Sequence, residues 1–409
     1  MKVLVVSQYF WPEVFRINNV VQSLVERGVT VDVLTGKPNY PKGMFYPGYR
    51  AWGCQTELLL GAKVYRLPLA ARGNHSARRL ALNYLSFIVS GVLFAPWILR
   101  RQRYDIVFVF GMSPILQAIP ALLIGWLKRL KVVIWVQDLW PESLEATGYV
   151  RNKRVLSMVE QVVRFIYRHT DLLLVQSKAF EDRVSNLAPG KPVVYYPNSV
   201  DHIFCDSPDV PLPLVTALDD GFAVVFAGNV GTGQAVEVIV EVSALLLDYP
   251  EIRFIVFGEG SRWAWMREQV QLQGLKNLHL PGRYPEVTMP GLMQKASALL
   301  VTLADRPIFA ATVPNKVQAY MAAGRPILAC LNGEGARLVA EAGAGLTVPA
   351  ENAPALANAV LRLYRMSAEE RSAMGANGRR YFKEHFDHDR LSDQLLEYFR
   401  SYSKYRKGS

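Results

Sequence analysis

Short apolar runs alternate with helical segments along the whole chain, and this alternation limits the folds that are open to it. The first run spans residues 2–6. A second, 30–34, follows a segment in which Val20, Val21 and Leu24 lie on one helical face. A strand–helix–strand order predicts parallel strands joined by crossover helices. The chain is therefore predicted to be an α/β protein, whose ligands bind at the carboxyl ends of its strands.

The alternation divides into two halves of similar size. Of the 409 residues, 51% are hydrophobic, which is enough apolar material for two cores. Residues 197–213 are rich in proline and turn-forming residues and are the predicted linker. We predict two doubly wound, Rossmann-like domains, 1–199 and 200–388, with a cleft between them, and an amphipathic helix, 389–406, that packs back on the first domain. The remaining predicted strands are 64–67, 105–109, 132–136, 172–175 and 193–195, then 222–227, 253–257, 278–280, 298–301, 327–330 and 346–348.

The net charge of +11 is concentrated in one region. No acidic residue occurs between Glu57 and Asp105, whereas eight basic residues do. A block of one sign indicates an anionic partner, either a membrane surface or a polyanion. Nucleic acid is not expected, because the block surrounds an apolar run and carries no recognition motif. The eight residues are Lys63, Arg66, Arg72, Arg78, Arg79, Arg100, Arg101 and Arg103.

The apolar run at 80–99 contains twenty uncharged residues and is flanked by arginine pairs. Its length would suffice to cross a bilayer. However, the strands before and after it are predicted to belong to one sheet, which a single crossing would divide between two compartments. We therefore predict that region 63–103 makes a peripheral contact with an anionic membrane surface. The alternative is a buried core helix whose flanking arginines face solvent.

Other features favour a cytosolic protein. The three cysteines, Cys54, Cys205 and Cys330, lie far apart and form neither a zinc spacing nor a disulfide framework. The N-terminus runs directly into a strand-like segment, without the pattern of a signal peptide. The predicted location is cytoplasmic, peripheral to the inner face of the cytoplasmic membrane.

Four strand ends in the second half carry glycine-rich or polar turns. GNVGTG, 228–233, does not match the dinucleotide fingerprint, but its glycines let backbone N–H groups approach a phosphate. GEGSR, 258–262, and PGRYPEVTMP, 281–290, follow the next two strands. TVPNK, 312–316, opens a helix and puts a lysine in the first turn, where the helix N-terminus favours a phosphate. Together these turns predict a phosphate site, although each alone is also consistent with an ordinary turn.

The order of the motifs GNVG, GEGS, LPGRYPE, TVPNKVQAYMAAGRPILA and GEGARLVAEAGAGLTV resembles the C-terminal half of retaining glycosyltransferases of family 4, which have the GT-B fold. The N-terminal motifs SQYFWPE, ERGVTVDVLTGKPNYPKG and VQDLWPESLEATG are similar to the sub-group that builds bacterial surface polysaccharides. Within that sub-group, the chain most resembles L-fucosamine transferases of O-antigen synthesis.

The resemblance implies which residues bind the donor. The nucleoside base is expected on the loop Gly282-Arg283-Tyr284, and the diphosphate near the glycine turn and the start of the helix at Asn315-Lys316. The expected donor-binding residues are Gly228, Asn229, Gly231, Glu259, Arg283, Tyr284, Asn315 and Lys316.

The resemblance also implies roles in the N-terminal half. Asp138, Lys316 and Arg16 are the expected catalytic residues, with Arg16 reaching the donor phosphates. Glu13, Asp138 and Glu142 are expected to bind the acceptor. For Asp138 an alternative remains, because an aspartate at a strand end often caps a helix.

The sequence departs from the family pattern at four positions. Two glutamates that usually contact the donor sugar and the ribose are replaced by Ala311 and Ala319. A basic pair after the glycine turn is replaced by Asn229 and Gln234. We therefore expect Lys316, with Arg16 or Arg283, to compensate the charge of the diphosphate.

The expected reaction is transfer of an N-acetylated amino sugar, such as L-FucNAc, from a UDP-sugar to a polyprenyl-diphosphate-linked glycan in O-antigen or capsule assembly. The resemblance implies retention of anomeric configuration. No aspartate-rich metal motif is evident, so no divalent metal or other cofactor is expected. Two alternatives remain, namely a GT-B sugar-nucleotide epimerase or hydrolase, and a noncatalytic partner subunit that has lost both glutamates.

Overall fold

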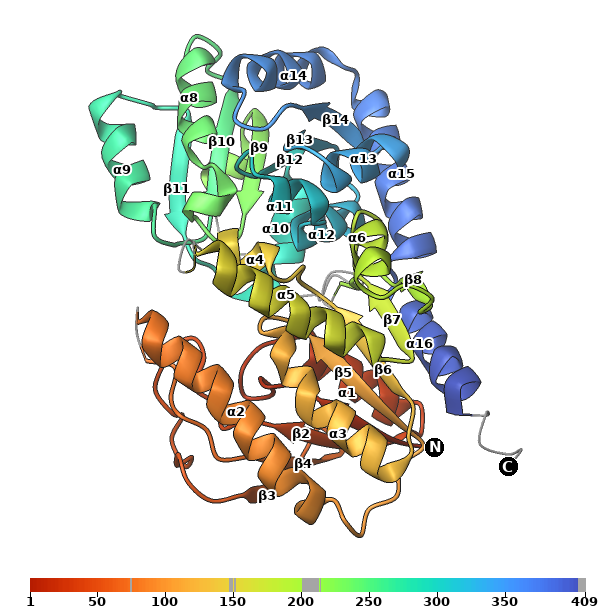
Figure 1. Ribbon diagram of the computed structural model, residues 1–409. Coiled ribbons are helices and arrows are strands. Elements are labelled where there is room, and N and C mark those ends of the chain that lie inside the picture. The colour runs from red at the N-terminus through yellow and green to blue at the C-terminus, as the bar shows by residue number, and fades with distance from the viewer. Residues whose placement is uncertain (74–75, 147–149, 151, 201–212, 214, 404–409) are drawn as a thin grey trace. The chain divides into compact units, whose positions relative to one another are not determined.

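The computed structural model describes residues 1–409 except 74–75, 147–149, 151, 201–212, 214 and 404–409 (Figure 1). The chain forms two compact units. Unit 1 comprises Met1–Tyr196 with Asp389–Ser409, and unit 2 comprises Pro197–His388. Residues 197–199, which we assigned to the first domain, thus belong to unit 2. Most of the predicted linker lies outside the described residues.

Unit 1 is built on an eight-stranded sheet with the order β3-β4-β2-β1-β5-β6-β7-β8. Every adjacent pair is parallel except β3 with β4. The sequence prediction missed β3, because its residues QTELL are polar and half-exposed at the sheet edge. The order of the strands reverses between β1 and β5. The strands are β1 Lys2–Val6, β2 Thr30–Thr35, β3 Gln55–Leu59, β4 Ala62–Arg66, β5 Ile106–Gly111, β6 Val132–Val136, β7 Leu172–Val175 and β8 Val193–Tyr195.

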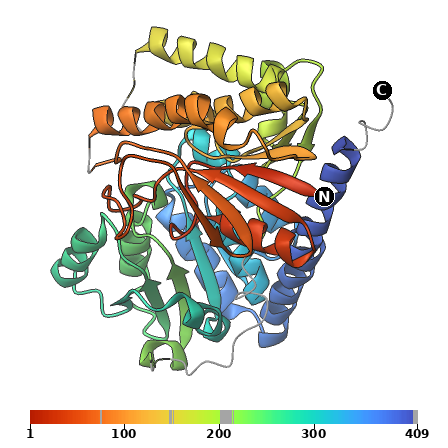
Figure 2. The same ribbon diagram turned by 90° about the horizontal axis from the view of Figure 1, so that it is seen from below.

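Helices cover both faces of this sheet. α2 and α3 lie on one face, and α1 and α16 lie on the other (Figure 2). A crossover helix between parallel strands must return across the sheet, which produces this two-sided layering. The helices are α1 Arg16–Glu26, α2 Ala77–Ile98, α3 Ala118–Lys128, α4 Glu142–Ala146, α5 Lys153–Arg168, α6 Phe180–Leu187 and α16 His388–Ser403, with a 3-10 turn at Ile115–Gln117.

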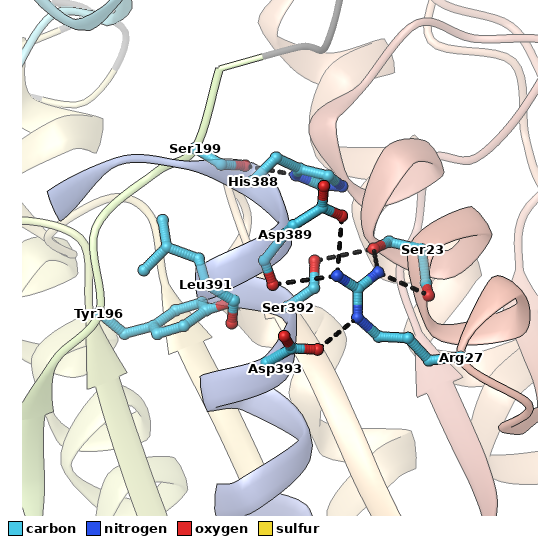
Figure 3. Close-up of polar contacts among 9 residues, drawn as sticks. All are labelled: Ser23, Arg27, Tyr196, Ser199, His388, Asp389, Leu391, Ser392 and Asp393. Carbon is cyan, nitrogen blue, oxygen red and sulfur yellow. Dashed lines mark hydrogen bonds and ion pairs between the residues drawn. The ribbon is translucent and has the colours of Figure 1, made fainter. Parts of the chain in front are cut away.

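The C-terminal helix α16 is part of unit 1, far from the rest of that unit in sequence. Arg27, which follows the last residue of α1, pairs with Asp389 at 2.7 Å and with Asp393 at 2.6 Å (Figure 3). Phe399 packs edge-on against Phe108 of β5, with ring centroids 5.2 Å apart. The described part of the predicted helix 389–406 therefore docks on unit 1 through ion pairs and an apolar core.

Each chain segment at the junction of the units is held on its own unit. In unit 1, the Tyr196 hydroxyl donates to the Leu391 carbonyl at 2.8 Å. In unit 2, Ser199 Oγ and His388 Nδ1 share a hydrogen bond of 2.9 Å (Figure 3). Hydrogen bonds thus hold the chain on both sides of each connection between the units, at Tyr196/Pro197 and at His388/Asp389.

Unit 2 contains a six-stranded, fully parallel sheet with the order β11-β10-β9-β12-β13-β14. This is the doubly wound order 3-2-1-4-5-6, and its switch point falls between β9 and β12. Separate apolar clusters fill the two faces of the sheet. The strands are β9 Phe222–Ala227, β10 Ile252–Phe257, β11 Leu278–Gly282, β12 Ala298–Thr302, β13 Ile327–Cys330 and β14 Gly345–Val348.

The helices of unit 2 include α12, which carries the predicted phosphate loop at its start and ends at Gly324, in the left-handed conformation with φ of 69°. The helices are α7 Thr216–Asp219, α8 Glu237–Leu245, α9 Trp263–Leu272, α10 Met289–Lys295, α11 Pro307–Ala311, α12 Asn315–Ala323, α13 Glu334–Glu341, α14 Ala353–Arg365 and α15 Ala368–His385, with 3-10 turns at Thr232–Gln234 and Glu286–Thr288.

Candidate active site

The loops that follow β9, β10 and β11 form one hydrogen-bonded layer at the carboxyl edge of the sheet of unit 2. A Cβ atom at Gly258 would lie 1.8 Å from the carbonyl oxygen of Gly228, so the two loops approach as closely as only glycine allows. The bonds are Gly228 N to Phe257 O at 2.8 Å, Val230 N to Glu259 O at 3.0 Å, and Gly258 N to Gly282 O at 2.9 Å. Three of the four predicted turns therefore lie together.

The fourth turn joins them through Lys316, in the first turn of α12. A Cβ atom at Gly228 would lie 2.6 Å from Lys316 Cε, so the lysine stem lies directly on the glycine turn. Its Nζ is 3.4 Å from the ring centroid of Phe226. The side chain is partly exposed, but the Nζ atom is buried and donates no hydrogen bond to any residue that the structure describes.

This burial changes the charge state of the lysine. Loss of solvent lowers the pKa of Lys316 to about 7, because the charged form loses hydration and gains no counter-ion. One turn later, Tyr320 holds the helix against the sheet, since its hydroxyl accepts from Ala227 N at 2.9 Å. The sequence analysis did not assign a role to Tyr320. The result is an amine without a hydrogen-bond partner among the described residues, and a nearby phosphate anion would favour its protonated form, with the proton taken up from solvent.

The polar residues of the glycine turn are paired with each other. Asn229 Nδ2 donates to Gln234 Oε1 at 3.1 Å, so the two positions that lack the family's basic pair form a neutral contact. A cation that the sequence analysis did not single out lies beside them. Arg262 donates its backbone N–H to Val230 at 3.0 Å, and its guanidinium pairs with Glu237 at 2.7 Å. Its position in the GEGSR turn, 258–262, is the sequence feature from which Arg262 could have been identified.

The residues predicted to hold the nucleoside base lie further along the same edge, at the end of β11. Tyr284 packs edge-on against Phe257, with centroids 5.3 Å apart. Arg283 is exposed, and Glu259 Oε1 is 3.9 Å from the position of a Cβ atom at Gly282. The predicted diphosphate and base residues therefore follow one another from β9 to β11.

The alanines that replace the family's glutamates are mostly enclosed. Ala319 is 9% exposed within α12, and Ala311 is half-buried at the end of α11. Neither offers a polar side chain to a donor sugar. The positive charge at this edge therefore comes from Lys316, Arg262 and Arg283.

In unit 1, Asp138 joins the carboxyl ends of β5 and β6. Its Oδ2 accepts hydrogen bonds from Ser113 N at 2.9 Å and from Ser113 Oγ at 2.8 Å. Trp140 Nε1 donates to the same Oγ at 2.9 Å. These bonds reach the neighbouring strand end rather than the helix that follows, so the helix-cap alternative does not describe this aspartate.

The structure corrects the role predicted for Glu13. Its side chain is 1% exposed, and Oε1 accepts from the backbone N–H groups of Asn39 at 2.8 Å and Tyr40 at 2.7 Å. Burial raises the pKa of Glu13 to about 7, against the opposing effect of these donors. A carboxylate that is buried and used in this way orders the loop after β2 and does not contact an acceptor directly.

Glu142 and Arg16 lie near the ends of other strands of unit 1. Glu142 Oε1 pairs with Arg183 Nε at 2.5 Å, whereas its Oε2 is buried and accepts no bond from a described residue. Arg16 is the first residue of α1 and is half-buried. Their roles at the acceptor and at the donor phosphates stay predictions.

A buried polar network in unit 1 connects Gln8, which follows β1, with α2 and with the 3-10 turn at Ile115–Gln117. The sequence analysis did not predict this network. Gln8 donates its backbone N–H to Gln117 Oε1 and its side-chain amide to Asn83 Oδ1, both at 2.7 Å. Asn83 in turn donates to the Ala70 carbonyl at 2.6 Å. Each residue appears in the sequence as an isolated polar position, so no local signal marks the network.

Two doubly wound units, one with a buried lysine on a glycine turn at its switch point, define the class of GT-B glycosyltransferases. Residues 221–366 match the family model described as "Glycosyl transferases group 1", and residues 14–199 match the "Glycosyl transferase 4-like domain". Each half of the chain thus matches a glycosyltransferase family model, and the protein is a transferase enzyme of the GT-B fold.

Two curated relatives are similar over most of the chain. WcaI of Escherichia coli K12, assigned as a glycosyl transferase of colanic acid biosynthesis, is 24% identical over 338 residues, which is 79% of this chain and 82% of the relative. WbjE of Pseudomonas aeruginosa, assigned as a glycosyltransferase, is 26% identical over 312 residues, covering 72% and 74%.

Solved structures share the fold at low sequence identity. Sucrose-phosphate synthase from Thermosynechococcus elongatus aligns with a TM-score of 0.71 at 16% identity, over 98% of each chain. Anabaena HepE in complex with UDP aligns with a TM-score of 0.69 at 13% identity, over 98% of this chain and 100% of that one. The E. coli trehalose-6-phosphate protein bound with UDP-2-fluoro glucose aligns at 0.71 and 15%, over 98% and 99%.

Proposed function

We propose that this enzyme transfers an N-acetylated amino sugar, such as L-FucNAc, from a UDP-sugar to a polyprenyl-diphosphate-linked glycan, with retention of configuration. The reaction takes place at the inner face of the bacterial cytoplasmic membrane, in assembly of O-antigen or a similar surface polysaccharide. The observation that carries the proposal is the buried, unpaired Nζ of Lys316 on the glycine turn at Gly228.

The leaving group supports this assignment. Cleavage of a sugar–diphosphate bond develops negative charge on the diphosphate, and preorganised donors stabilise that charge in the transition state. Lys316 and the first turn of α12 supply a cation and free N–H groups at one point. Lys316 Nζ is already next to the glycine turn, and no carboxylate of a described residue pairs with it, so binding requires little reorganisation.

The donor and pathway are supported by similarity. Two of the solved structures with this fold contain UDP or a UDP-sugar analogue. The relative from E. coli is assigned to colanic acid biosynthesis, which is a route to a surface polysaccharide. Asp138, with its Oδ2 held by Ser113, is the residue we assign to the acceptor hydroxyl.

The test is a thermal-shift panel of UDP, GDP, ADP and UDP-linked sugars, followed by a transfer assay with a lipid-linked acceptor. We expect UDP and a UDP-linked N-acetylamino sugar to raise the melting temperature, since a ligand that binds only the folded state stabilises it. Release of UDP without a glycosylated lipid would favour a hydrolase. A shift with GDP or ADP in place of UDP would refute the proposed donor.

A further inference from the structure

The helix α2 of unit 1 presents an apolar stripe to solvent. Leu85 is 55% exposed, Leu93 is 64% exposed and Trp97 is 66% exposed. Intervals of three or four positions separate Leu82, Leu85, Val89, Leu93 and Trp97, which therefore share one helical face, and Val92 and Phe94 flank them. The stripe consists of Leu82, Leu85, Val89, Val92, Leu93, Phe94 and Trp97, and arginines stand before and after it.

The inner face of the same helix carries its polar groups. Asn83 is fully buried, and Ser90 is 8% exposed. Ser86 Oγ accepts from the backbone N–H of Ala70 at 3.0 Å. Gly91 packs so closely on α3 that a Cβ atom there would lie 2.4 Å from Pro120. Phe87 and Ala95 are also fully buried, so α2 is apolar on its exposed face as well as within the unit, unlike a helix on a water-exposed surface, whose outer face is polar.

The fold excludes both a membrane span and a core helix. The segment Arg78–Ile98 is long and apolar enough to cross a bilayer, with a mean hydropathy of 1.6, but β4 before it and β5 after it belong to one sheet. Only 28% of its apolar window is buried, so it is not a core helix either. A helix of this kind is suited to lie in the plane of a membrane interface.

A cationic cavity of about 350 Å³ lies at the C-terminal end of α2. Lys63, Arg100 and Arg101 line it, and none of the three forms an ion pair with a described residue. Arg100 lies over the Trp97 ring at 4.6 Å, and Lys63 over the Tyr65 ring at 5.3 Å.

Tyr65 supplies an independent sign of a ligand. It lines the cavity, is 4% exposed, and its hydroxyl is buried without a hydrogen-bond partner in the described part of the chain. A buried hydroxyl without a partner is unfavourable, and a phosphate oxygen would satisfy it.

The C-terminus of α3 adjoins this cavity and extends the apolar surface. Lys128 Nζ donates to the carbonyl of Gln102, a lining residue, at 2.8 Å. The neighbouring Trp126 is 76% exposed. Tryptophan side chains are favoured at the boundary between acyl chains and headgroups.

We propose that α2 lies in the membrane interface, with its stripe among the acyl chains, and that the cavity binds the phosphate of an anionic phospholipid headgroup. Three unpaired cations and a free hydroxyl match a phosphodiester, and the adjacent stripe and Trp126 match the chains of the same lipid. The residues of this surface belong to unit 1 and the proposed donor-binding residues at the glycine turn to unit 2, so the inference does not depend on the sugar or nucleotide.

The test is sedimentation of the full chain with phosphatidylcholine vesicles that either contain or lack one-third phosphatidylglycerol. The wild type is expected to bind only the anionic vesicles and to be released by high salt. R100Q/R101Q removes two cations and should lower the partition coefficient roughly 30-fold. L85E/L93E should abolish binding, and Tyr65→Phe should weaken the preference for anionic vesicles without loss of fold.

Control variants distinguish binding through this surface from nonspecific effects of a change in surface charge or hydrophobicity. R267Q/L272E changes an exposed arginine and a leucine that is 72% exposed on α9 of unit 2, and it should bind vesicles like the wild type. All variants should keep the thermal shift with UDP, which reports the other site. Equal binding to both vesicle types, or loss of binding in the α9 control, would overturn the proposal. So would a thermal shift with inorganic phosphate that R100Q/R101Q abolishes while vesicle binding persists.

Discussion

Replacement of Lys316 by methionine should make the protein more stable and inactive at the same time. The side chains have similar length, so packing on Gly228 and Phe226 is largely kept. The pKa of Lys316 is lowered from its ordinary 10.5 to about 7, and each pKa unit corresponds to about 1.4 kcal/mol. The buried charge therefore costs about 5 kcal/mol, and the methionine variant avoids this cost.

The sign of the pH dependence follows from linkage. Between pH 7 and 10.5 the folded protein binds fewer protons at Lys316 than the unfolded chain does, so wild-type stability rises with pH. Lys316→Met removes this dependence. The gain in stability should be full below about pH 7 and should vanish near pH 10.5.

Lys316→Met should raise the stability of the protein but lower its affinity for the nucleotide. A bound diphosphate raises the pKa of Lys316 again, so UDP binding takes up a proton and weakens about tenfold per pH unit above pH 7. Lys316→Met should lose this pH dependence and most UDP affinity, and turnover should fall roughly 10²- to 10³-fold.

The assay is urea unfolding with and without UDP from about pH 6 to 10, with calorimetry in buffers of different ionisation enthalpy to count the proton. Lys295→Met is the matched control, because Lys295 is 42% exposed and pairs with Asp219 at the surface of the same unit. Its stability should change by less than about 0.5 kcal/mol. A Lys316→Met variant that is less stable than the wild type near pH 6, or that keeps its UDP response, would refute the reasoning.

Three further predictions concern other residues and the absence of a metal requirement. Glu13→Ala leaves buried backbone N–H groups of Asn39 and Tyr40 without an acceptor, so it should destabilise unit 1 by about 3 kcal/mol in urea unfolding, yet leave the UDP thermal shift intact. Asp138→Asn should lower turnover roughly 10²-fold with unchanged UDP affinity; an unchanged rate would remove Asp138 from the reaction. Dialysis against EDTA should leave the transfer rate unaffected, and restoration of a lost rate by Mg²⁺ would contradict metal independence.

Local sequence patterns were sufficient to predict most of the strands and their order along the chain. Strands such as β1, β6 and β9 were predicted at their observed bounds, because buried parallel strands are continuous apolar runs. The edge strand β3 was missed because its half-exposed residues lack such a run. The motifs likewise assigned Lys316 and Gly228 to one predicted site, and the structure brings these two residues into contact.

The sequence by itself determined the α/β class and the two halves, and it predicted the residues of a phosphate site, since these depend on short-range periodicity and motif order. Only the tertiary structure decided that Lys316 Nζ is buried without a partner, that Glu13 is occupied by backbone donors, and that α2 turns its apolar side outward. These properties depend on which loops, distant in the chain, meet at a sheet edge. The burial of each side chain and its hydrogen-bond partners depend on these tertiary contacts, so they cannot be read from a local stretch of sequence.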